Sequence, residues 1–448
     1  MLRETPALAH AYLVGGCVRD ALIGTEGKDF DLEVFGIDSG TLIRALSPWG
    51  RTDTVGRSFG VVKLSIPGHT FDFSLPRRDS KTGPGHRGFE VDVDPGLSPR
   101  EAAARRDFTV NAMMYDPRRG ELLDFFGGES DLQNRILRHT SPAFSEDPLR
   151  VLRGMQFASR FELTAAPETL ELCRSISGTY GELAIERVRE EWMKWATKSV
   201  LPSAGLRFLR DAGWLEHFPE VAALAGVKQD PEWHPEGDVW THTLECLDAL
   251  MTLPEWQAAD AAGRAILALA VLAHDFGKPA CTQIVERDGR MRIVSPGHEP
   301  AGGPIAVSFL ERLAIPASLA DSVVPLVLNH LAHLTDPTPR AIRRLARRLA
   351  PATIRQLAVV MTADAFGRPP RPREIPAGVS GLLAAAGTMK LASSAPRPIL
   401  LGRHLTSEGW VPGPEFKPVL DAAFEAQLDG VFADLEGALN WLRTRSRG

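Results

Sequence analysis

The chain has 448 residues, of which 44% are hydrophobic and 24% charged, and its formal net charge is −5. This composition excludes general disorder, and the length predicts roughly three domains. Because the total charge is mildly acidic, any nucleic acid must be bound by local basic patches. Four widely spaced cysteines indicate reduced thiols in a cytoplasmic protein, and we find no signal peptide and no membrane-spanning run.

The first informative segment joins a Gly-Gly turn to an Asp-x-Asp pair on a predicted strand. Side chains of a strand alternate, so Asp29 and Asp31 are predicted to share one face and to bind hard cations such as Mg²⁺. Two such cations support nucleotidyl transfer. Gly15 and Gly16 let the backbone approach a triphosphate, and Arg19 lies within reach of a phosphate oxygen. Taken alone, the pair of acids is equally compatible with an ordinary exposed strand.

Together these two elements resemble the class II tRNA nucleotidyltransferases and the related bacterial poly(A) polymerases. The resemblance implies a small nucleotidyltransferase head with a mixed β-sheet, followed by helical neck and body segments. Strands are predicted over residues 59–67 and 70–75, where Asp72 is either a third carboxylate near the metals or an exposed strand residue. A flexible loop is predicted over residues 77–99. Family members restricted to C addition have this region shortened, so its presence disfavours a CC-only enzyme.

The second motif, Arg-Arg-Asp-Phe-Thr-Val-Asn-Ala at residues 105–112, is interpreted as a helix face that contacts a nucleotide. Arg106 can pair with a triphosphate, and Asp107 can accept a hydrogen bond from a ribose hydroxyl. Asn111 lies one helical turn further along that face. A solvated helix start is the alternative. In the resembling family this motif serves the incoming nucleotide, and the match is complete.

The third motif begins at Glu146 and enters a helix predicted over residues 148–161. The carboxylate of Asp147 can accept from the exocyclic amine that cytosine and adenine share, and Arg150 can donate to a ring nitrogen or carbonyl. Arg153, on the same face, is predicted to meet phosphates. An N-capped helix with surface arginines is the alternative. In the resembling family this element selects CTP and ATP. A further signature at residues 186–192 also resembles the family, and it is interpreted as structural: its ion pairs lie inside one helix, which supports the helix of the third motif.

Helical periodicity dominates downstream, where imidazoles and carboxylates suit a divalent transition metal. The candidate ligands are His242, His274, Asp275 and Asp364, with His298 and His330 as ligands of a second metal or of a substrate phosphate. The set resembles the HD phosphohydrolase superfamily, through the turn at residues 274–278 and the Ala-Asp-x-x-Gly segment at 363–367. That resemblance implies a metal-dependent phosphatase or cyclic phosphodiesterase. For any single histidine, a helix cap or a filled polar pocket is the alternative.

These segments predict an α+β chain in four parts. The parts are a nucleotidyltransferase head (1–138), a helical neck and body for base selection and RNA binding (139–235), an HD domain (236–370) and a helical tail (371–448). A basic amphipathic helix over residues 340–349 either binds phosphates or forms a solvated surface.

The predicted function is template-independent addition of CCA to the 3′ end of tRNA from CTP and ATP. Mg²⁺ is expected in the head and a transition metal in the HD site, with a second, phosphohydrolase activity there. Three alternatives stay open: an A-adding enzyme or poly(A) polymerase, an HD phosphohydrolase whose head grips RNA, and a non-catalytic RNA-binding protein. The HD-type site weighs against a poly(A) polymerase. The oligomeric state is left open.

Overall fold

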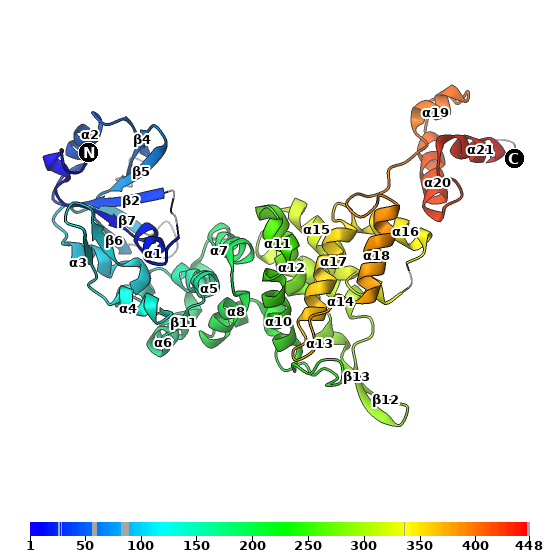
Figure 1. Cartoon of the computed structure of the whole chain (residues 1–448), viewed down its shortest axis with the longest axis horizontal. Coiled ribbons are helices and arrows are strands. Elements are labelled where there is room, and N and C mark those ends of the chain that lie inside the picture. Colours follow the sequence, from blue (N-terminus) through cyan, green and yellow to red (C-terminus); the bar gives the residue numbers. More distant parts are fainter. Residues whose placement is uncertain (26, 28, 56–60, 82–88, 336, 446–448) are drawn as a thin grey trace. The chain divides into compact units, whose positions relative to one another are not determined.

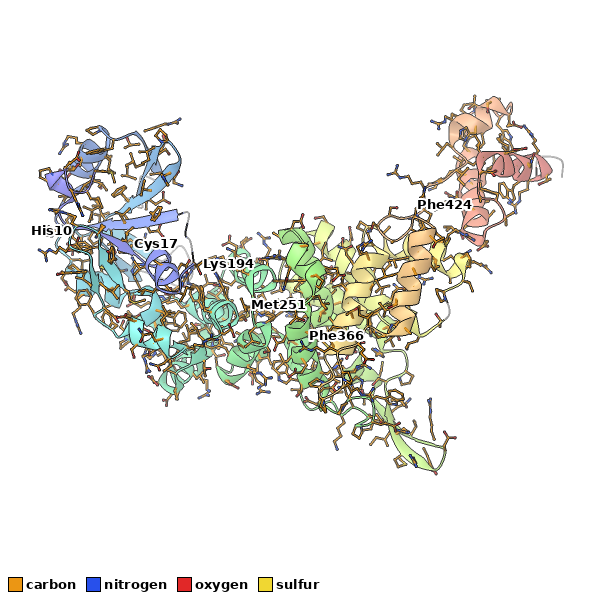
Figure 2. All side chains as sticks on the ribbon, viewed as in Figure 1. His10, Cys17, Lys194, Met251, Phe366 and Phe424 are labelled. Atoms are coloured by element: carbon orange, nitrogen blue, oxygen red, sulfur yellow. The ribbon has the colours of Figure 1, made fainter. Side chains whose placement is uncertain are left out.

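The computed structural model describes residues 1–25, 27, 29–55, 61–81, 89–335 and 337–445, which fold into two compact units, Met1–His217 and Phe218–Gly448 (Figure 1). Side chains fill the interior of each unit (Figure 2). The expected α+β class is confirmed, because a mixed sheet near the N-terminus is followed by helices. The four-part division is finer than these two units and stays a prediction. None of the described helices has the length and apolarity needed to cross a membrane.

Within the described residues, seven strands form one sheet in the order β3-β4-β5-β2-β1-β8-β9. Its strands are β1 (Ala11–Val14), β2 (Asp29–Val34), β3 (Arg51–Val55), β4 (Val61–Ile66), β5 (His69–Ser74), β8 (Met114–Asp116) and β9 (Glu121–Leu123). Strands β2 and β5 run parallel, whereas the other neighbouring pairs are antiparallel. The parallel register sets Asp31 opposite Asp72. The two predicted strands thus correspond to β4 and β5.

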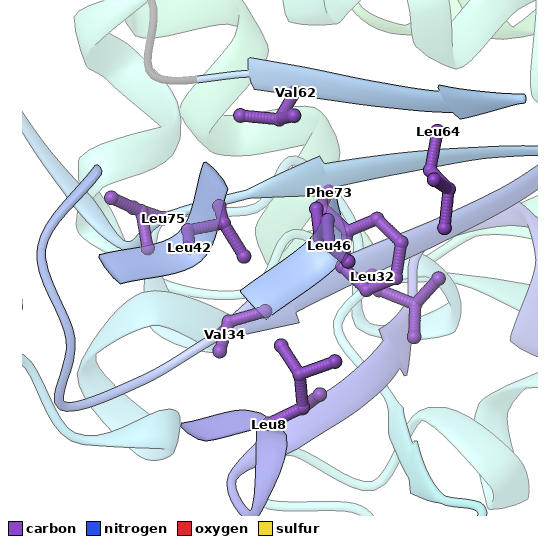
Figure 3. Close-up of a cluster of buried hydrophobic side chains, with 10 residues drawn as sticks. Leu8, Leu32, Val34, Leu42, Leu46, Val62, Leu64, Phe73 and Leu75 are labelled. Carbon is purple, nitrogen blue, oxygen red and sulfur yellow. The ribbon is translucent and has the colours of Figure 1, made fainter. Parts of the chain in front are cut away.

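An apolar core covers one face of this sheet and fixes which way the acids of β2 point. Leu32 and Val34 are buried in that core together with Leu42 and Leu46 of α2 (Ser39–Leu46) (Figure 3). Because successive side chains of a strand point to opposite faces, Asp31 and Glu33 are directed to the other face. A register slip by one residue would turn the acids toward the core, so the core also determines which face Asp31 and Glu33 occupy.

The segment predicted as a loop over residues 77–99 instead contains two antiparallel strands, β6 (Arg77–Lys81) and β7 (Phe89–Val93). Residues 82–88 lie outside the described part of the chain. The loop prediction was wrong for these strands, because flanking glycines, prolines and charges outweighed the alternation of apolar and acidic residues in β7. The helix α3 (Pro99–Ala104) follows, capped by Ser98.

The remaining elements of the first unit are mostly helical. They are η1 (Pro6–Leu8), α1 (Gly16–Leu22), η3 (Thr109–Asn111), α4 (Gly128–Gln133), β10 (Ile136–Leu137), η4 (Pro142–Glu146), α5 (Leu149–Phe161), β11 (Thr164–Ala165), α6 (Pro167–Ser175), η5 (Ser177–Glu182), α7 (Ile185–Lys198), α8 (Pro202–Asp211) and η6 (Leu215–His217). The helix expected for the second motif does not form. Helix α3 ends at Ala104, and only the short η3 follows.

The second unit is helical apart from one hairpin. Its elements are α9 (Pro219–Ala222), α10 (Val239–Met251), α11 (Pro254–Ala258), α12 (Ala261–Ala273), α13 (Lys278–Cys281), β12 (Gln283–Arg287), β13 (Arg290–Val294), α14 (His298–Arg312), α15 (Ala317–Leu328), η7 (Ala332–Leu334), α16 (Pro339–Leu349), α17 (Ile354–Phe366), α18 (Ala377–Thr388), α19 (Gly402–Ser407), α20 (Phe416–Asp429) and α21 (Leu435–Arg445). Helices α10, α12, α14, α15 and α17 pack against one another.

The predicted basic helix is α16, and its arginines contact α20 of the tail. Arg344 lies 2.6 Å from Asp429 and 3.1 Å from Glu425, and Arg340 also pairs with Asp429. Arg347 lies over the ring of Phe424. This face is therefore packed against acidic and aromatic side chains, which favours a structural role over phosphate binding.

Candidate active sites

A cavity of about 520 Å³ opens on the face of the sheet opposite the apolar core. Acidic side chains of strands line one part of it, and arginines from the following helices line the rest. The lining includes Asp31, Glu33, Asp72, Arg105, Arg106, Asp107, Asp147, Arg150, Arg153 and Arg187. Seven of the residues predicted from sequence are thus brought together. Among the described side chains, Gly16, Arg19 and Asn111 do not line the cavity, and the side chain of Asp29 lies outside the described part.

The acidic wall is built by neighbouring parallel strands. Asp31 of β2 is exposed and faces the same cavity as Asp72 of β5, whose Oδ1 lies 3.5 Å from Lys63 Nζ. Glu33, two residues further along β2, binds Arg106 at 3.2 Å. Sequence reasoning missed Glu33, although the same alternation that grouped the aspartates predicts its position. Carboxylate oxygens in an open cavity fit Mg²⁺.

The Gly-Gly turn makes room for one arginine of the second motif. Gly15 has a φ of +71°, and a Cβ at this position would lie 2.9 Å from Arg106 Nη1. Only glycine combines this backbone conformation with so close an approach. The turn and the second motif, far apart in sequence, are therefore parts of one structure.

A buried network joins the second motif to α1 and α5. Arg19, only 4% exposed, donates to Asn111 Oδ1, and Asn111 donates to Asp107 Oδ1 at 2.9 Å. Arg153 Nε donates to the other oxygen of Asp107 at 2.7 Å. Burial alone would raise the pKa of Asp107, but Arg153 and Asn111 hold it below its ordinary value. Arg19 and Asn111 thus position Asp107, and the contact between Asn111 and Asp107 forms without the expected helix.

The third motif places an acid and an arginine beside the cavity, each fixed by other parts of the chain. Asp147 accepts from Leu149 N with one oxygen and from Arg187 Nη2, at 2.9 Å, with the other. Arg150 donates to the carbonyl oxygens of Ala143 and Arg105. Arg187 lies in the segment interpreted as a structural support of the base-selecting helix, with ion pairs inside its own helix. Its contact with Asp147, 40 residues away, is not of the intrahelical type. The expected intrahelical type is seen between Glu191 and Lys194.

The second unit brings all six predicted metal ligands into one buried cluster, and none of them is more than 6% exposed. They are His242, His274, Asp275, His298, His330 and Asp364. Asp275 lies at the centre of this His-Asp cluster. Its Oδ2 is 3.3 Å from His274 Nε2, and its Oδ1 is 3.5 Å from His298 Nε2.

Three of the imidazoles are oriented by their own chain segments. The Nδ1 atoms of His274, His298 and His330 lie 2.7–2.8 Å from the carbonyl oxygens of Val271, Ser295 and Val327. A ring nitrogen that faces a carbonyl carries the proton, so the Nε2 lone pairs are left for a metal. Burial lowers the pKa of His330 to about 3, which keeps this imidazole neutral. The donor set fits a transition metal.

Several neighbours of this cluster were not predicted as site residues. Glu236 Oε1 lies 2.7 Å from His242 Nδ1 and 2.8 Å from His234 Nδ1. Burial opposes ionisation of Glu236, but these two imidazoles lower its pKa to about 2. Lys278 Nζ lies 2.7 Å from Asp275, and Arg368 pairs with Asp364. A cavity of about 350 Å³ adjoins these groups.

A family model described as the poly A polymerase head domain matches residues 11–138. The multifunctional CCA protein of Xanthomonas campestris pv. campestris (strain B100) is 38% identical over 369 residues, which cover 80% of this chain and 85% of that protein. The chain belongs to the multifunctional CCA protein family. Another member, from Nitrosococcus oceani, is 36% identical over 367 residues, or 80% of this chain and 84% of the relative.

Comparison with solved structures shows that the present chain has the fold of CCA-adding enzymes. A Bacillus stearothermophilus CCA-adding enzyme in complex with CTP superposes with a TM-score of 0.63 at 20% identity, covering 98% of this chain and 94% of that one. A Thermotoga maritima CCA-adding enzyme complexed with tRNA gives a TM-score of 0.57 at 20% identity, with coverages of 96% and 91%.

Proposed function

We propose that the chain adds CCA to the 3′ end of tRNA without a nucleic-acid template, using CTP and ATP. One observation carries this proposal: a single cavity in which acids of β2 and β5 face arginines from α5 and α7. Asp29, Asp31 and Asp72 would hold Mg²⁺, which when bound activates a hydroxyl and stabilises the leaving pyrophosphate. Membership of the multifunctional CCA family supports the same activity.

The arginines of the cavity would bind the triphosphate. Arg106 reaches the cavity beside the Gly-Gly turn, and Arg153 reaches it from α5, so both can face phosphate oxygens. Gly16 and Arg19 do not line the cavity, so they would support the residues that do, with Arg19 acting through its hydrogen bond to Asn111. Asp107 would accept from the ribose, while Asn111 holds its carboxylate in place.

Asp147 and Arg150 would select the base. Arg150 and Asp147 already form hydrogen bonds within the protein, and these bonds fix the directions in which their remaining donor and acceptor positions point. Arg187 adds a further restraint on Asp147. An acceptor beside a fixed donor suits cytosine and adenine, whose exocyclic amines occupy equivalent positions.

Incubating tRNA that lacks CCA with Mg²⁺ and each labelled nucleotide tests this proposal. Incorporation of two C residues followed by one A is expected. Incorporation of A alone would identify an A-adding enzyme, and long runs of A a poly(A) polymerase. No incorporation at all would favour the non-catalytic RNA-binding alternative.

The His-Asp cluster favours a second function, a transition-metal-dependent phosphohydrolase. The two oxygens of Asp275 face different imidazoles. Asp275, His242, His274 and Asp364 would hold one metal, which when bound supplies Lewis-acid chemistry for hydrolysis. His298 and His330 would hold a second metal or the substrate phosphate. Lys278 and Arg368 line the adjoining cavity, where a substrate phosphate would find positive charge.

Hydrolysis of a chromogenic phosphate monoester and of a cyclic nucleotide by metal-loaded protein tests this second activity. Asp275→Ala should abolish it, whereas Asp31→Ala should leave it intact and abolish nucleotide incorporation. If the Asp31 variant kept every activity of the protein, the alternative of an HD phosphohydrolase with an RNA-binding head would be favoured.

A further inference from the structure

The buried thiol of Cys246 lies among the predicted metal ligands, and no sequence motif assigns it a role. It is 0% exposed on α10, one helical turn after His242, and its Sγ lies 3.4 Å from His242 Nε2. Single ligand atoms of His242, Cys246, His274 and Asp364 all lie within 4.8 Å of one another. Donors about 2.0–2.3 Å from one tetrahedral ion are roughly 3.3–3.8 Å apart, so a small adjustment suffices.

A second observation in this cluster indicates a ligand. His274 is 1% exposed and its Nδ1 faces Val271 O, so the lone pair of its Nε2 faces only an acceptor, Asp275 Oδ2 at 3.3 Å, and has no hydrogen-bond partner among the described residues. A buried imidazole nitrogen without a hydrogen bond costs free energy unless a ligand compensates it. The same cluster that holds this nitrogen also contains the thiol.

The absence of a side chain at Gly367 leaves room for the sulfur of Cys246. A Cβ on Gly367, at the end of α17, would lie 2.3 Å from Cys246 Sγ and 2.7 Å from Cys246 N. Glycine therefore lets α17 approach α10 closely enough to bring Asp364 Oδ1 to 3.1 Å from His242 Nε2. Glu236 fixes the orientation of His242 through Nδ1, which directs Nε2 toward Asp364.

We propose that Cys246 is a thiolate ligand of the metal bound by His242, His274 and Asp364. This inference rests on the proposed metal site of the second unit. Binding would release the thiol proton to solvent and form one metal–sulfur bond. Because thiolate is a soft donor, it biases the site toward zinc, cobalt or nickel and against magnesium and manganese. The two proposed activities would then draw on separate metals within one chain.

Loading the metal-free full-length protein with Co²⁺ and recording its absorption spectrum tests the proposal. A thiolate-to-cobalt charge-transfer band in the near ultraviolet is expected in the wild type. It should disappear in Cys246→Ser and stay in Cys281→Ser, a control in the same unit outside the cluster. Affinity for Co²⁺ should fall about 10–100-fold in Cys246→Ser.

X-ray absorption of the zinc-loaded wild type adds a measurement that depends on no variant. A sulfur scatterer at about 2.3 Å from zinc is expected. Bound metal with only nitrogen and oxygen neighbours would overturn the role of Cys246 and leave the proposed metal site standing. Failure of the wild type to bind Co²⁺ more tightly than Asp364→Ala would refute the metal site itself.

Discussion

The two candidate sites differ in exposure and in donor chemistry. In the head, Asp31 is exposed and the Asp72 side chain is 39% exposed. The candidate metal-ligand atoms there are carboxylate oxygens. In the second unit, the candidate ligands are at most 6% exposed, and four of the six are imidazoles. An open oxygen site suits cations that arrive and leave with each triphosphate, whereas a buried nitrogen-rich site suits a resident ion. Under the two proposed functions, one chain would therefore separate an exchanging metal in the head from a retained metal in the second unit.

The largest expected effect comes from Asp31→Asn, which removes a charge from the acidic wall without changing its size. Loss of charge stabilisation worth about 3–4 kcal/mol should lower nucleotide incorporation about 10²–10³-fold. Phosphohydrolase activity and retained metal should stay unchanged. A variant that lost both activities together would contradict the separation of the two sites.

Asp364→Asn should have the opposite pattern. Removing this buried ligand should lower the affinity for a transition metal at least about 10–100-fold, as measured by metal content after dialysis. Incorporation of C and A into tRNA should continue at the wild-type rate. Since the substitution leaves Arg368 without its carboxylate partner, circular dichroism should first establish that the helices are intact.

Arg153→Met tests how far the buried network of the head depends on one arginine. Asp107 would lose its strongest partner, at a cost of about 1–3 kcal/mol, limited because 36% of the Arg153 side chain is exposed and screened. Hydrogen exchange of α5 should accelerate accordingly. Arg160→Met, on the same helix, provides the control.

The sign of the pH dependence follows from Asp107, whose pKa is lowered by folding. Stability from the pair is fully present above the pKa of the unfolded carboxyl, about 3.9, and is lost as pH falls through the lower folded value. The difference between wild type and Arg153→Met should therefore shrink below about pH 4. A difference that stayed constant across that range would exclude the carboxylate as its cause.

Arg187→Met should produce a smaller change, confined to base selection. Without this partner, Asp147 gains freedom, and discrimination of CTP against UTP should fall by about 1 kcal/mol, roughly fivefold in kcat/KM. Lys194→Met removes a similar charge from the same helix outside the cavity lining and should leave the ratio unchanged. Equal losses with both nucleotides would indicate general damage instead.

The smallest effect is expected for Arg344→Ala in α16. This side chain already contacts Asp429 and Glu425, so its removal should leave tRNA affinity and the salt dependence of binding unchanged. A reduced salt slope in a filter-binding titration would show that α16 contacts phosphates after all.

Residues that the sequence groups into short motifs are the ones whose proximity could be predicted, while their roles stay predictions. Asp31, Asp107 and Asp147 come from three motifs, and the structure places all three beside one cavity. The alternation of apolar and acidic residues in β2 is a local pattern, and so are the His-Asp-x-Gly-Lys turn at 274–278 and the Ala-Asp-x-x-Gly segment at 363–367.

What the sequence did not predict are contacts between distant segments without a periodic signal. Arg187 reaches Asp147 across 40 residues, and Glu236 lies in a segment outside any helix or strand yet fixes His242. The helix predicted around Asp107 does not form, and one of the contacts that replace it, from Arg153, also comes from a distant residue. The hydrogen bonds of Asp107 to Arg153 and Asn111 position the motif without helical geometry.

His274, His298 and His330 each hold their Nδ1 near the carbonyl oxygen three residues earlier, and this affects the order of folding and metal binding in the second unit. Each ring is aimed by its own backbone, so no ion is needed to gather these three donors. Unlike a zinc finger, which is unfolded without its ion, this unit should fold first and bind the proposed metal afterwards. Chelation should then yield an intact apoprotein that can be recharged with a different metal.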